Sequence, residues 1–216
     1  MSNATYHERF LGEAGAEAYA RKHTRSLVRR LSARRELACV RRALRAVEAC
    51  GRVLDLPCGA GRLQPLLREC ATTPLASDRS PRMIEILARS CPGPPRAFAS
   101  DALAIALRSR AVEGVVSVRL LHHFPDAVER RRLIAELARV ARRFLVLTFL
   151  DAGSAKQRLH LLKRRLRKLS VQRALVSREE ITADVAAHGF ETVGFFRLSS
   201  WFSGQTVVAC LRRGSA

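Results

Sequence analysis

The sequence predicts an α/β fold in which a seven-stranded, mostly parallel sheet carries helices on both faces and its last strand runs antiparallel. Two observations lead to this prediction. From residue 52 onward, short apolar runs alternate with helical patterns, which is typical of a parallel sheet with crossover helices. Near the C-terminus two such runs are separated only by a turn at Ser203 and Gly204, which indicates an antiparallel pair. A length of 216 residues suits one such domain.

Seven apolar segments are predicted as strands, and right-handed crossovers are expected between the parallel ones. In chain order they are Arg52–Leu56, Pro74–Asp78, Arg96–Ala99, Gly114–Val118, Arg143–Phe149, Phe190–Leu198 and Gln205–Leu211. The helical pattern before the first strand predicts an N-terminal helical cap over residues 1–47. Residues 48–216 are then a single structural unit, with a basic helical insert at about 152–176.

Three of the predicted helices begin at recognisable capping residues. Ser80 precedes Pro81, which suits the first position of a helix. Asp126 and Ser177 each stand three residues before a glutamate, the spacing of a capping box. The helix that begins after Ser177 is expected to end at Gly189, because glycine tolerates the left-handed conformation that closes many helices.

The chain is strongly basic, with 39 lysines and arginines against 19 acidic residues and a net charge of +20. Two stretches carry most of the excess: Arg21–Arg45 holds ten basic residues and Glu36, and Lys156–Arg178 holds nine and no acid. The second has the pattern of a basic amphipathic helix. Two interpretations stay open. The charge is either a solvated face in an arginine-rich chain or a surface that meets phosphates or anionic lipid headgroups.

The six cysteines include no C-x-x-C pair, so we expect small buried thiols and no metal site. No apolar run approaches the roughly 20 residues of a membrane span, and the first ten residues lack the pattern of a secretory signal. We therefore expect a cytoplasmic protein. The basic stretches add the expectation that it is peripheral at the inner membrane surface.

The most informative segment runs from Val53 to Leu63, where an apolar strand is followed by a glycine-containing turn and the start of a helix. Ligands of open parallel sheets bind beyond the carboxyl ends of such strands. Gly59 and Gly61 lack β-carbons where a ligand must approach the backbone, and the amides that open the next helix favour an anionic group. A tight turn without a ligand is the alternative.

Carboxylates follow the next two predicted strands. Asp78 ends the second strand, where a carboxylate can accept hydrogen bonds from both hydroxyls of a ribose. Asp101 follows the third strand, where it can accept one from an adenine amino group. A single aspartate at a strand end is often only a turn residue. With Asp55 on the first strand, however, three neighbouring strand ends predict a nucleoside site.

With these residues in place, the sequence resembles the class I S-adenosylmethionine-dependent methyltransferases over Val53–Arg212. The family's first motif, acid-x-Gly-x-Gly-x-Gly, reads here Asp55 to Gly61, with Pro57 in place of the first glycine. The resemblance implies a Rossmann-like sheet, with the methionine part of the cofactor at Gly59 and Gly61. The cofactor-binding residues expected on this basis are Asp55, Pro57, Gly59, Gly61, Asp78, Arg79, Met83, Asp101, Ala102, Ser117 and Arg119.

The segment from Val116 to Asp126 is similar to the fourth motif in the small-molecule branch of that family, which includes quinone-ring methyltransferases. A nicotinamide-binding dehydrogenase fits less well, because its G-x-G-x-x-G fingerprint would end here at Gln64.

A methyl group on a sulfonium is already activated, so the enzyme's main task is to orient the acceptor and exclude water. His122 and His123 follow the fourth strand and are candidates for a general base, although a loop that only shapes the pocket is the alternative. By the same resemblance, Tyr6, Tyr19 and Arg21 are candidate lid residues of the N-terminal helices.

The sequence therefore predicts an S-adenosylmethionine-dependent methyltransferase that acts on a small-molecule or lipid-linked acceptor, with the basic helices docking at an anionic membrane surface. An RNA methyltransferase is the second interpretation. It is weakened because no N-P-P-Y-type tetrapeptide follows the fourth strand and few aromatic residues are available for base stacking. A noncatalytic nucleic-acid-binding protein with the same fold is the third.

Overall fold

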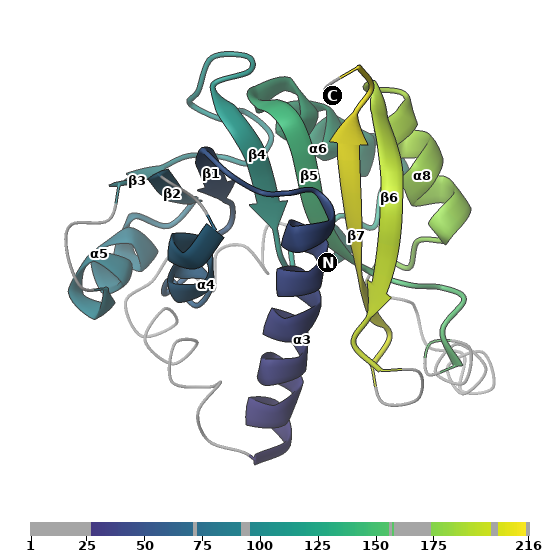
Figure 1. Cartoon of the computed structure of the whole chain (residues 1–216), viewed down its shortest axis with the longest axis horizontal. Helices are drawn as coiled ribbons and strands as arrows, with labels where there is room; N and C mark the ends of the chain where they lie inside the picture. The colour runs from purple at the N-terminus through teal and green to yellow at the C-terminus, as the bar shows by residue number, and fades with distance from the viewer. Residues whose placement is uncertain are drawn as a thin grey trace.

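A computed structural model of the chain describes residues 27–70, 73–91, 96–155, 157, 174–199 and 203–214. Its centre is a seven-stranded sheet in the order β3-β2-β1-β4-β5-β7-β6 (Figure 1). All seven predicted strands are confirmed, with ends shifted by at most two residues. Their bounds are β1 (Arg52–Asp55), β2 (Thr73–Asp78), β3 (Arg96–Ala99), β4 (Val112–Ser117), β5 (Ala141–Leu150), β6 (Phe190–Arg197) and β7 (Gln205–Arg212).

The direction of the strands also agrees with the sequence analysis. β1 pairs in parallel with β2 on one side and with β4 on the other, and β3 and β5 extend the parallel part of the sheet. β7 runs antiparallel to both β5 and β6. The carboxyl ends of β1 to β5 consequently lie along one edge of the sheet.

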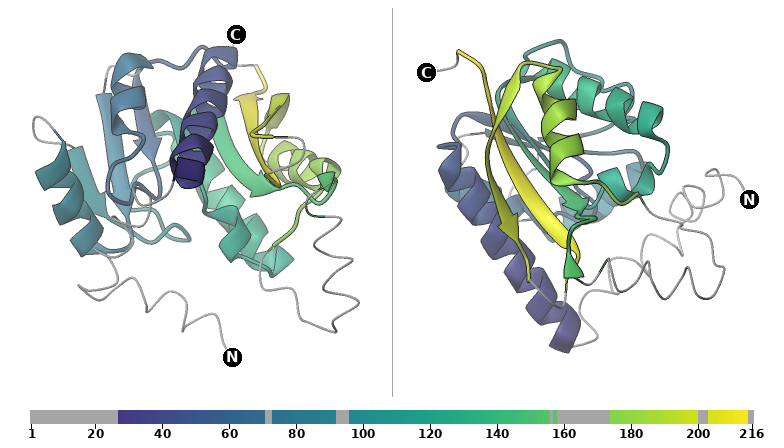
Figure 2. Two further views of the ribbon diagram at one scale, coloured as in Figure 1. Left: turned by 90° about the horizontal axis from the view of Figure 1, so that it is seen from below. Right: turned by 90° about the vertical axis from the view of Figure 1, so that its right-hand side faces the viewer.

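Helices cover both faces of the sheet (Figure 2). α3 and α4 share one apolar cluster with the sheet, and α6 and α8 share another on the opposite face. α5 packs mainly on β2 and β3. The bounds are α3 (Leu27–Ala46), α4 (Gln64–Cys70), α5 (Pro81–Ser90), α6 (Ala127–Val140) and α8 (Arg178–Ala186), with a 3-10 turn η1 (Leu121–His123).

The predicted helix starts are confirmed, but one of the caps works differently. Ser177 forms a full capping box with Glu180, and the Asp126 side chain accepts from the Glu129 N–H. Ser80 occupies the N-cap position of α5, yet its side chain makes no capping hydrogen bond. Instead Oδ1 of Asp78 accepts from the Ser80 N–H at 2.9 Å. Asp78, two residues before the cap, therefore stabilises this helix start.

The core is apolar on both sides of the sheet. Leu133, Ile134 and Leu137 of α6 are completely buried against one face. On the other face the buried residues of α3 include Val40 and Ala43. Each fully buried leucine- or valine-sized side chain contributes about 1.5–3 kcal/mol relative to an exposed one. All six cysteines are free thiols, and Cys39, Cys58 and Cys210 are buried.

Some predictions concern segments outside the described residues. These are the candidate lid residues Tyr6, Tyr19 and Arg21 and most of the basic insert, Lys156 and residues 158–173. Of the predicted N-terminal cap, the described part is α3, which packs on β5, β6 and β7. None of the described helices is both long enough and apolar enough to cross a membrane.

Gly114 in β4 pairs with Phe144 in β5, and a β-carbon at this position would collide with the phenyl ring. Phe144 is fully buried and cannot easily move aside. We expect Gly114→Ala to lower the free energy of unfolding by about 1–3 kcal/mol through overpacking. Urea denaturation measures the change. Adding Phe144→Leu should recover part of the loss, and an unchanged midpoint for Gly114→Ala would contradict the packing described here.

Candidate active site

The loop after β1 is tied to both neighbouring strands. The Leu56 N–H donates to the Val116 carbonyl of β4 at 3.0 Å, and the Cys58 N–H donates to the Ser77 carbonyl of β2 at 2.8 Å. These bonds hold the loop across the carboxyl ends of three strands. Pro57, which departs from the family motif, lies between the two anchored residues and follows a cis peptide bond.

The two glycines of this loop have different roles. Both have left-handed backbones, with φ of +51° at Gly59 and +82° at Gly61. A β-carbon at Gly59 would have no atom of the described residues within 4 Å, so they leave the space beside this backbone open. A β-carbon at Gly61 would collide with Leu87 of α5, so this glycine is required for packing. Gly59 thus leaves room for a ligand, whereas Gly61 lets α5 approach the loop.

Asp78 joins the loop to the start of α5. Its Oδ2 accepts from the Gly59 N–H at 3.0 Å and its Oδ1 accepts from the Ser80 N–H. Burial raises the pKa of this carboxyl above its usual value, and the backbone hydrogen bonds oppose the rise. Each oxygen retains a lone pair, so Asp78 can still accept hydrogen bonds from the two hydroxyls of a ribose.

Asp101 lies beside this carboxylate, because the Ser100 N–H donates to the Asp78 carbonyl at 3.0 Å. Its side chain is 46% exposed, and Oδ1 accepts from the Leu103 N–H at 2.9 Å. Oδ2 lies 4.0 Å from Nε of Arg79, which is also exposed. The second oxygen of Asp101 is therefore accessible to a donor such as an adenine amino group. Ala102 follows and is half-buried.

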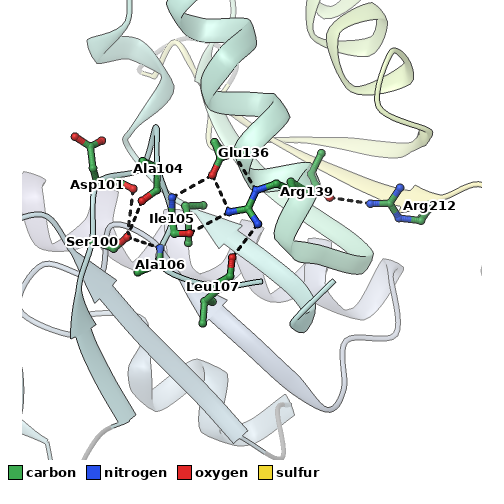
Figure 3. Close-up of polar contacts among 10 residues, drawn as sticks. Ser100, Asp101, Ala104, Ile105, Ala106, Leu107, Glu136, Arg139 and Arg212 are labelled. Carbon is green, nitrogen blue, oxygen red and sulfur yellow. Dashed lines mark hydrogen bonds and ion pairs between the residues drawn. The ribbon is translucent and has the colours of Figure 1, made fainter. Parts of the chain in front are cut away.

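Two residues of α6 that sequence reasoning missed fix the loop that carries Asp101 (Figure 3). Glu136 and Arg139 form a bidentate pair at 2.9 Å. Glu136 accepts from the Ile105 N–H at 3.1 Å, and Arg139 donates to the carbonyls of Ile105 and Leu107 at 3.0 and 2.8 Å. The bond from Arg139 lowers the pKa of the Glu136 carboxyl. The charged pair thus replaces regular secondary structure as the support of this loop.

Asp55 is fully buried at the end of β1. Its Oδ2 accepts from Nε2 of Gln64 at 3.1 Å, while its Oδ1 has no hydrogen-bond partner in the described part of the chain. Burial raises the pKa of Asp55 to about 7. Gln64, the residue that breaks the dinucleotide fingerprint, therefore serves here as the partner of a buried acid.

A second buried polar atom, Oγ of Ser117 at the end of β4, likewise finds no partner among the described residues. The parallel register places Asp55 opposite Val116, so the two unpaired groups end adjacent strands. Buried polar atoms without partners are rare in folded proteins. A ligand that brings a positive charge and hydrogen-bond donors fits this pair.

Arg119 is held by an ion pair that was not predicted. Nε of Arg119 lies 2.9 Å from Oε1 of Glu36, and Nη2 of Arg62 lies 2.6 Å from Oε2 of the same glutamate. Glu36 belongs to α3 and is fully buried. The Arg119 N–H also donates to Oγ1 of Thr148 at 2.6 Å. One carboxylate thus fixes the loops after β1 and β4.

We use the word crevice for the region beyond the carboxyl ends of β1, β2 and β4, which the loops after these strands surround. The other predicted residues lie on elements that follow these strands. His122 and His123 form η1 just after β4, with ring centroids 4.0 Å apart and both side chains half-buried. The His122 carbonyl accepts from the Ala174 N–H at 3.1 Å, which ties this turn to the chain after the basic insert. Met83 is buried inside α5. Its contact with the cofactor stays a prediction.

Comparisons with known proteins agree with this geometry. Residues 53–143 match a family model described as a methyltransferase domain. The structure of magnesium protoporphyrin IX methyltransferase (ChlM) from Synechocystis PCC 6803 with bound S-adenosylhomocysteine (SAH) is similar, with a TM-score of 0.76 at 17% identity. That match covers 98% of this chain and 100% of the other. A SAM-dependent methyltransferase from Thermotoga maritima matches with a TM-score of 0.62 at 17% identity, over 85% and 92% of the two chains.

Curated sequence relatives cover less of the chain. The tRNA (carboxymethyluridine(34)-5-O)-methyltransferase ALKBH8 of Mus musculus and that of Macaca fascicularis are each 29% identical over 99 residues. The matched segment is 46% of this chain and only 14% of the length of those relatives. The similarity is therefore confined to a short part of much longer proteins.

The raised pKa of Asp55 gives the ligand-free protein a specific pH dependence. Because the folded chain holds this proton more tightly than the unfolded chain, the unfolded state ionises first as the pH rises from about 4 to about 7. We expect the free energy of unfolding to fall over that window by at most about 4 kcal/mol, at about 1.4 kcal/mol per pKa unit. Asp55→Asn should remove the part of this slope that Asp55 contributes, as measured by urea denaturation, whereas Asp101→Asn should keep it. An equal slope in wild type and Asp55→Asn would refute the assignment.

Breaking the buried ion pair of α3 should affect both the fold and the crevice. We expect Glu36→Gln to lower the free energy of unfolding by about 1–3 kcal/mol, since two guanidinium groups lose a charged partner. The affinity for SAH should fall as well, because the loops after β1 and β4 lose their common anchor.

The matched control is Glu69→Gln, which breaks an exposed pair between the same helix and α4, through Arg41. That change should cost less than about 0.5 kcal/mol and leave SAH binding unaltered. Calorimetry with SAH and urea denaturation measure the two effects. Equal behaviour of the two variants would show that the Glu36 pair does not support the crevice.

Proposed function

Because the chain carries a methyltransferase domain of the class I fold, for which S-adenosylmethionine is the methyl donor, we propose that it methylates an anionic small-molecule or lipid-linked acceptor. The observation that carries the proposal is the edge of the sheet where Asp55, Asp78 and Asp101 end or follow three adjacent strands beside the open backbone of Gly59. These groups match the charges and donors of an amino-acid-bearing nucleoside.

The residues present fit that cofactor. Asp78 would accept the ribose hydroxyls and Asp101 the adenine amino group, as their accessible lone pairs allow. Oδ1 of Asp55 and Nη1 of Arg62 are buried and have no hydrogen-bond partner among the described residues. The first suits the ammonium group of the methionine part, and the second suits its carboxylate. When bound, the cofactor supplies a methyl group already activated by its sulfonium.

The protein's task is then to hold the acceptor in line with the methyl group, which can contribute about 7–11 kcal/mol. His122 and His123 stand just past the end of β4 and could accept a proton from an acceptor hydroxyl or nitrogen. An acceptor that reacts through a carboxylate has no proton to lose and needs no base. Single-turnover methyl transfer by His122→Gln and His123→Gln separates these cases, since unchanged rates in both remove histidine from the mechanism.

Two observations support the acceptor class. ChlM, named for a small-molecule acceptor, matches this chain along its whole length rather than in the cofactor domain alone. The net charge of +20 favours a negatively charged acceptor or surface. Together they support an anionic small or lipid-linked molecule over a neutral one.

RNA is the second candidate acceptor. The observation in its favour is the match to curated relatives named as tRNA methyltransferases, at 29% identity over 99 residues. The methyltransferase domain also supports an enzyme over a noncatalytic binding protein of the same fold.

Labelled S-adenosylmethionine tests the proposal directly. The full chain is incubated with extract of the source cell, which is then separated into small-molecule, lipid and RNA fractions. We expect label in the small-molecule or lipid fraction. Asp78→Ala should weaken SAH binding about 10- to 100-fold, because it removes the charged carboxylate that accepts the hydrogen bonds of the ribose. This variant should transfer no label to any fraction.

Label confined to RNA would favour the second candidate. The absence of label from every fraction, together with no calorimetric heat for SAH, would refute the proposal.

A further inference from the structure

The outward face of α3 carries six exposed arginines, which we call the arginine face. They are Arg30, Arg34, Arg35, Arg41, Arg42 and Arg45. At about 100° per residue, these positions fall within a sector about 140° wide, directly opposite the buried residues of the helix. Leu31, which is 51% exposed, and Ala38 lie in the middle of that sector, between two rows of arginines.

Composition alone does not explain this face, because the other described α-helices carry their own acids. α4 has Glu69, α5 has Glu85, α6 has Glu129 and Glu136, and α8 has Glu179, Glu180 and Asp184. The acid within α3 is Glu36, which is fully buried and directed at Arg62 and Arg119. The arginine face therefore contains no acid of its own.

The contacts of the described residues leave this face accessible. Arg41 pairs with Glu69, but both side chains are about half-exposed, so the pair is weak. Arg42 lies over the ring of Phe196 with its guanidinium 5.3 Å from the centroid, an arrangement that leaves the edge of the guanidinium open. The apolar side of α3, including Val40, Ala43 and Leu44, is already used by the core. The helix can therefore meet a partner only through its charged side.

We propose that the arginine face docks the protein on an anionic lipid surface. A flat surface can touch both rows of arginines at once, with Leu31 seated among headgroups and the guanidinium groups bound to lipid phosphates. A cluster of four to eight basic residues on one helix is typical of such surfaces. An RNA strand is the less favoured partner, because α3 contains no aromatic residue on which a base could stack.

The position of the face links it to the crevice. Glu36 contacts the loops after β1 and β4, and the first turns of α3 extend past the carboxyl end of β4 (Figure 1). Arg30 and Arg34 lie within about 9 Å of Glu36 along the helix axis. A lipid surface on this face would lie close to the carboxyl ends of β1 and β4. This consequence rests on the proposed function, since it would deliver a lipid-linked acceptor, but the docking itself does not.

Sedimentation of the full chain with vesicles tests the surface. The vesicles consist of phosphatidylcholine alone or of phosphatidylcholine mixed with phosphatidylglycerol. The test variant combines Arg30→Gln, Arg34→Gln and Arg35→Gln. The matched control combines Arg89→Gln, Arg108→Gln and Arg132→Gln, which removes the same charge from exposed arginines elsewhere.

We expect wild type to bind only the anionic vesicles. The α3 variant should lose on the order of 100-fold in affinity and the control much less. Calorimetry with SAH in the absence of lipid verifies that each variant is folded and reports on the cofactor site separately.

Three results would overturn the proposal. Wild type that binds neither kind of vesicle would exclude lipid docking. Equal losses of vesicle affinity in the α3 variant and the control would show that binding depends on the total charge of the protein and not on the arginine face. Binding to RNA that the α3 variant loses, with vesicle binding unchanged, would assign the face to nucleic acid. None of these results concerns SAH binding, so the proposed function stands or falls independently.

Discussion

β1 is only four residues long, yet its parallel pairing with β2 on one side and β4 on the other determines where the polar groups of the crevice lie. Because these strands share a direction, Asp55, Asp78 and Ser117 end on the same edge of the sheet. The strands behind them are apolar and fully buried, as at Val53 and Val116. That core offsets the unfavourable burial of polar groups that have no partner within the described chain.

The strands and helix starts were predictable because they depend on local signals. Buried parallel strands are continuous apolar runs, and Ser177 with Glu180 has a spacing that only a capping box explains. The candidate site was only partly predictable. Several of its features depend on contacts between residues distant in sequence. Leu87 requires a glycine at position 61, Glu36 pairs with Arg119, and Arg139 supports the loop of Asp101. No local pattern encodes them, although a lone acid among ten basic residues was a signal for Glu36.

The contribution of each arginine to the electric field outside the protein depends on its surroundings. Arg62 and Arg119 are neutralised in part by Glu36, Arg139 by Glu136, and Arg178 by the buried Asp151 at 3.0 Å. These arginines fix loops to the sheet and contribute little to the external field. The arginines of α3 differ, because their helix turns its acid inward. The external positive charge of the described chain is thus concentrated on one helix more than a uniform arginine-rich composition would give.

α3 therefore joins two functions in one rigid element. Its inner side holds the loops after β1 and β4 through Glu36, and its outer side presents the arginine face. α3 packs on β6 and β7 through buried residues such as Val40 and Ala43, so we expect a contact at its outer side to leave the position of the helix unchanged. Contact at the outer side should consequently change the position of the crevice relative to the lipid surface and the local concentration of the acceptor. The apparent KM should therefore change, while the chemical step, and hence kcat, should stay unchanged.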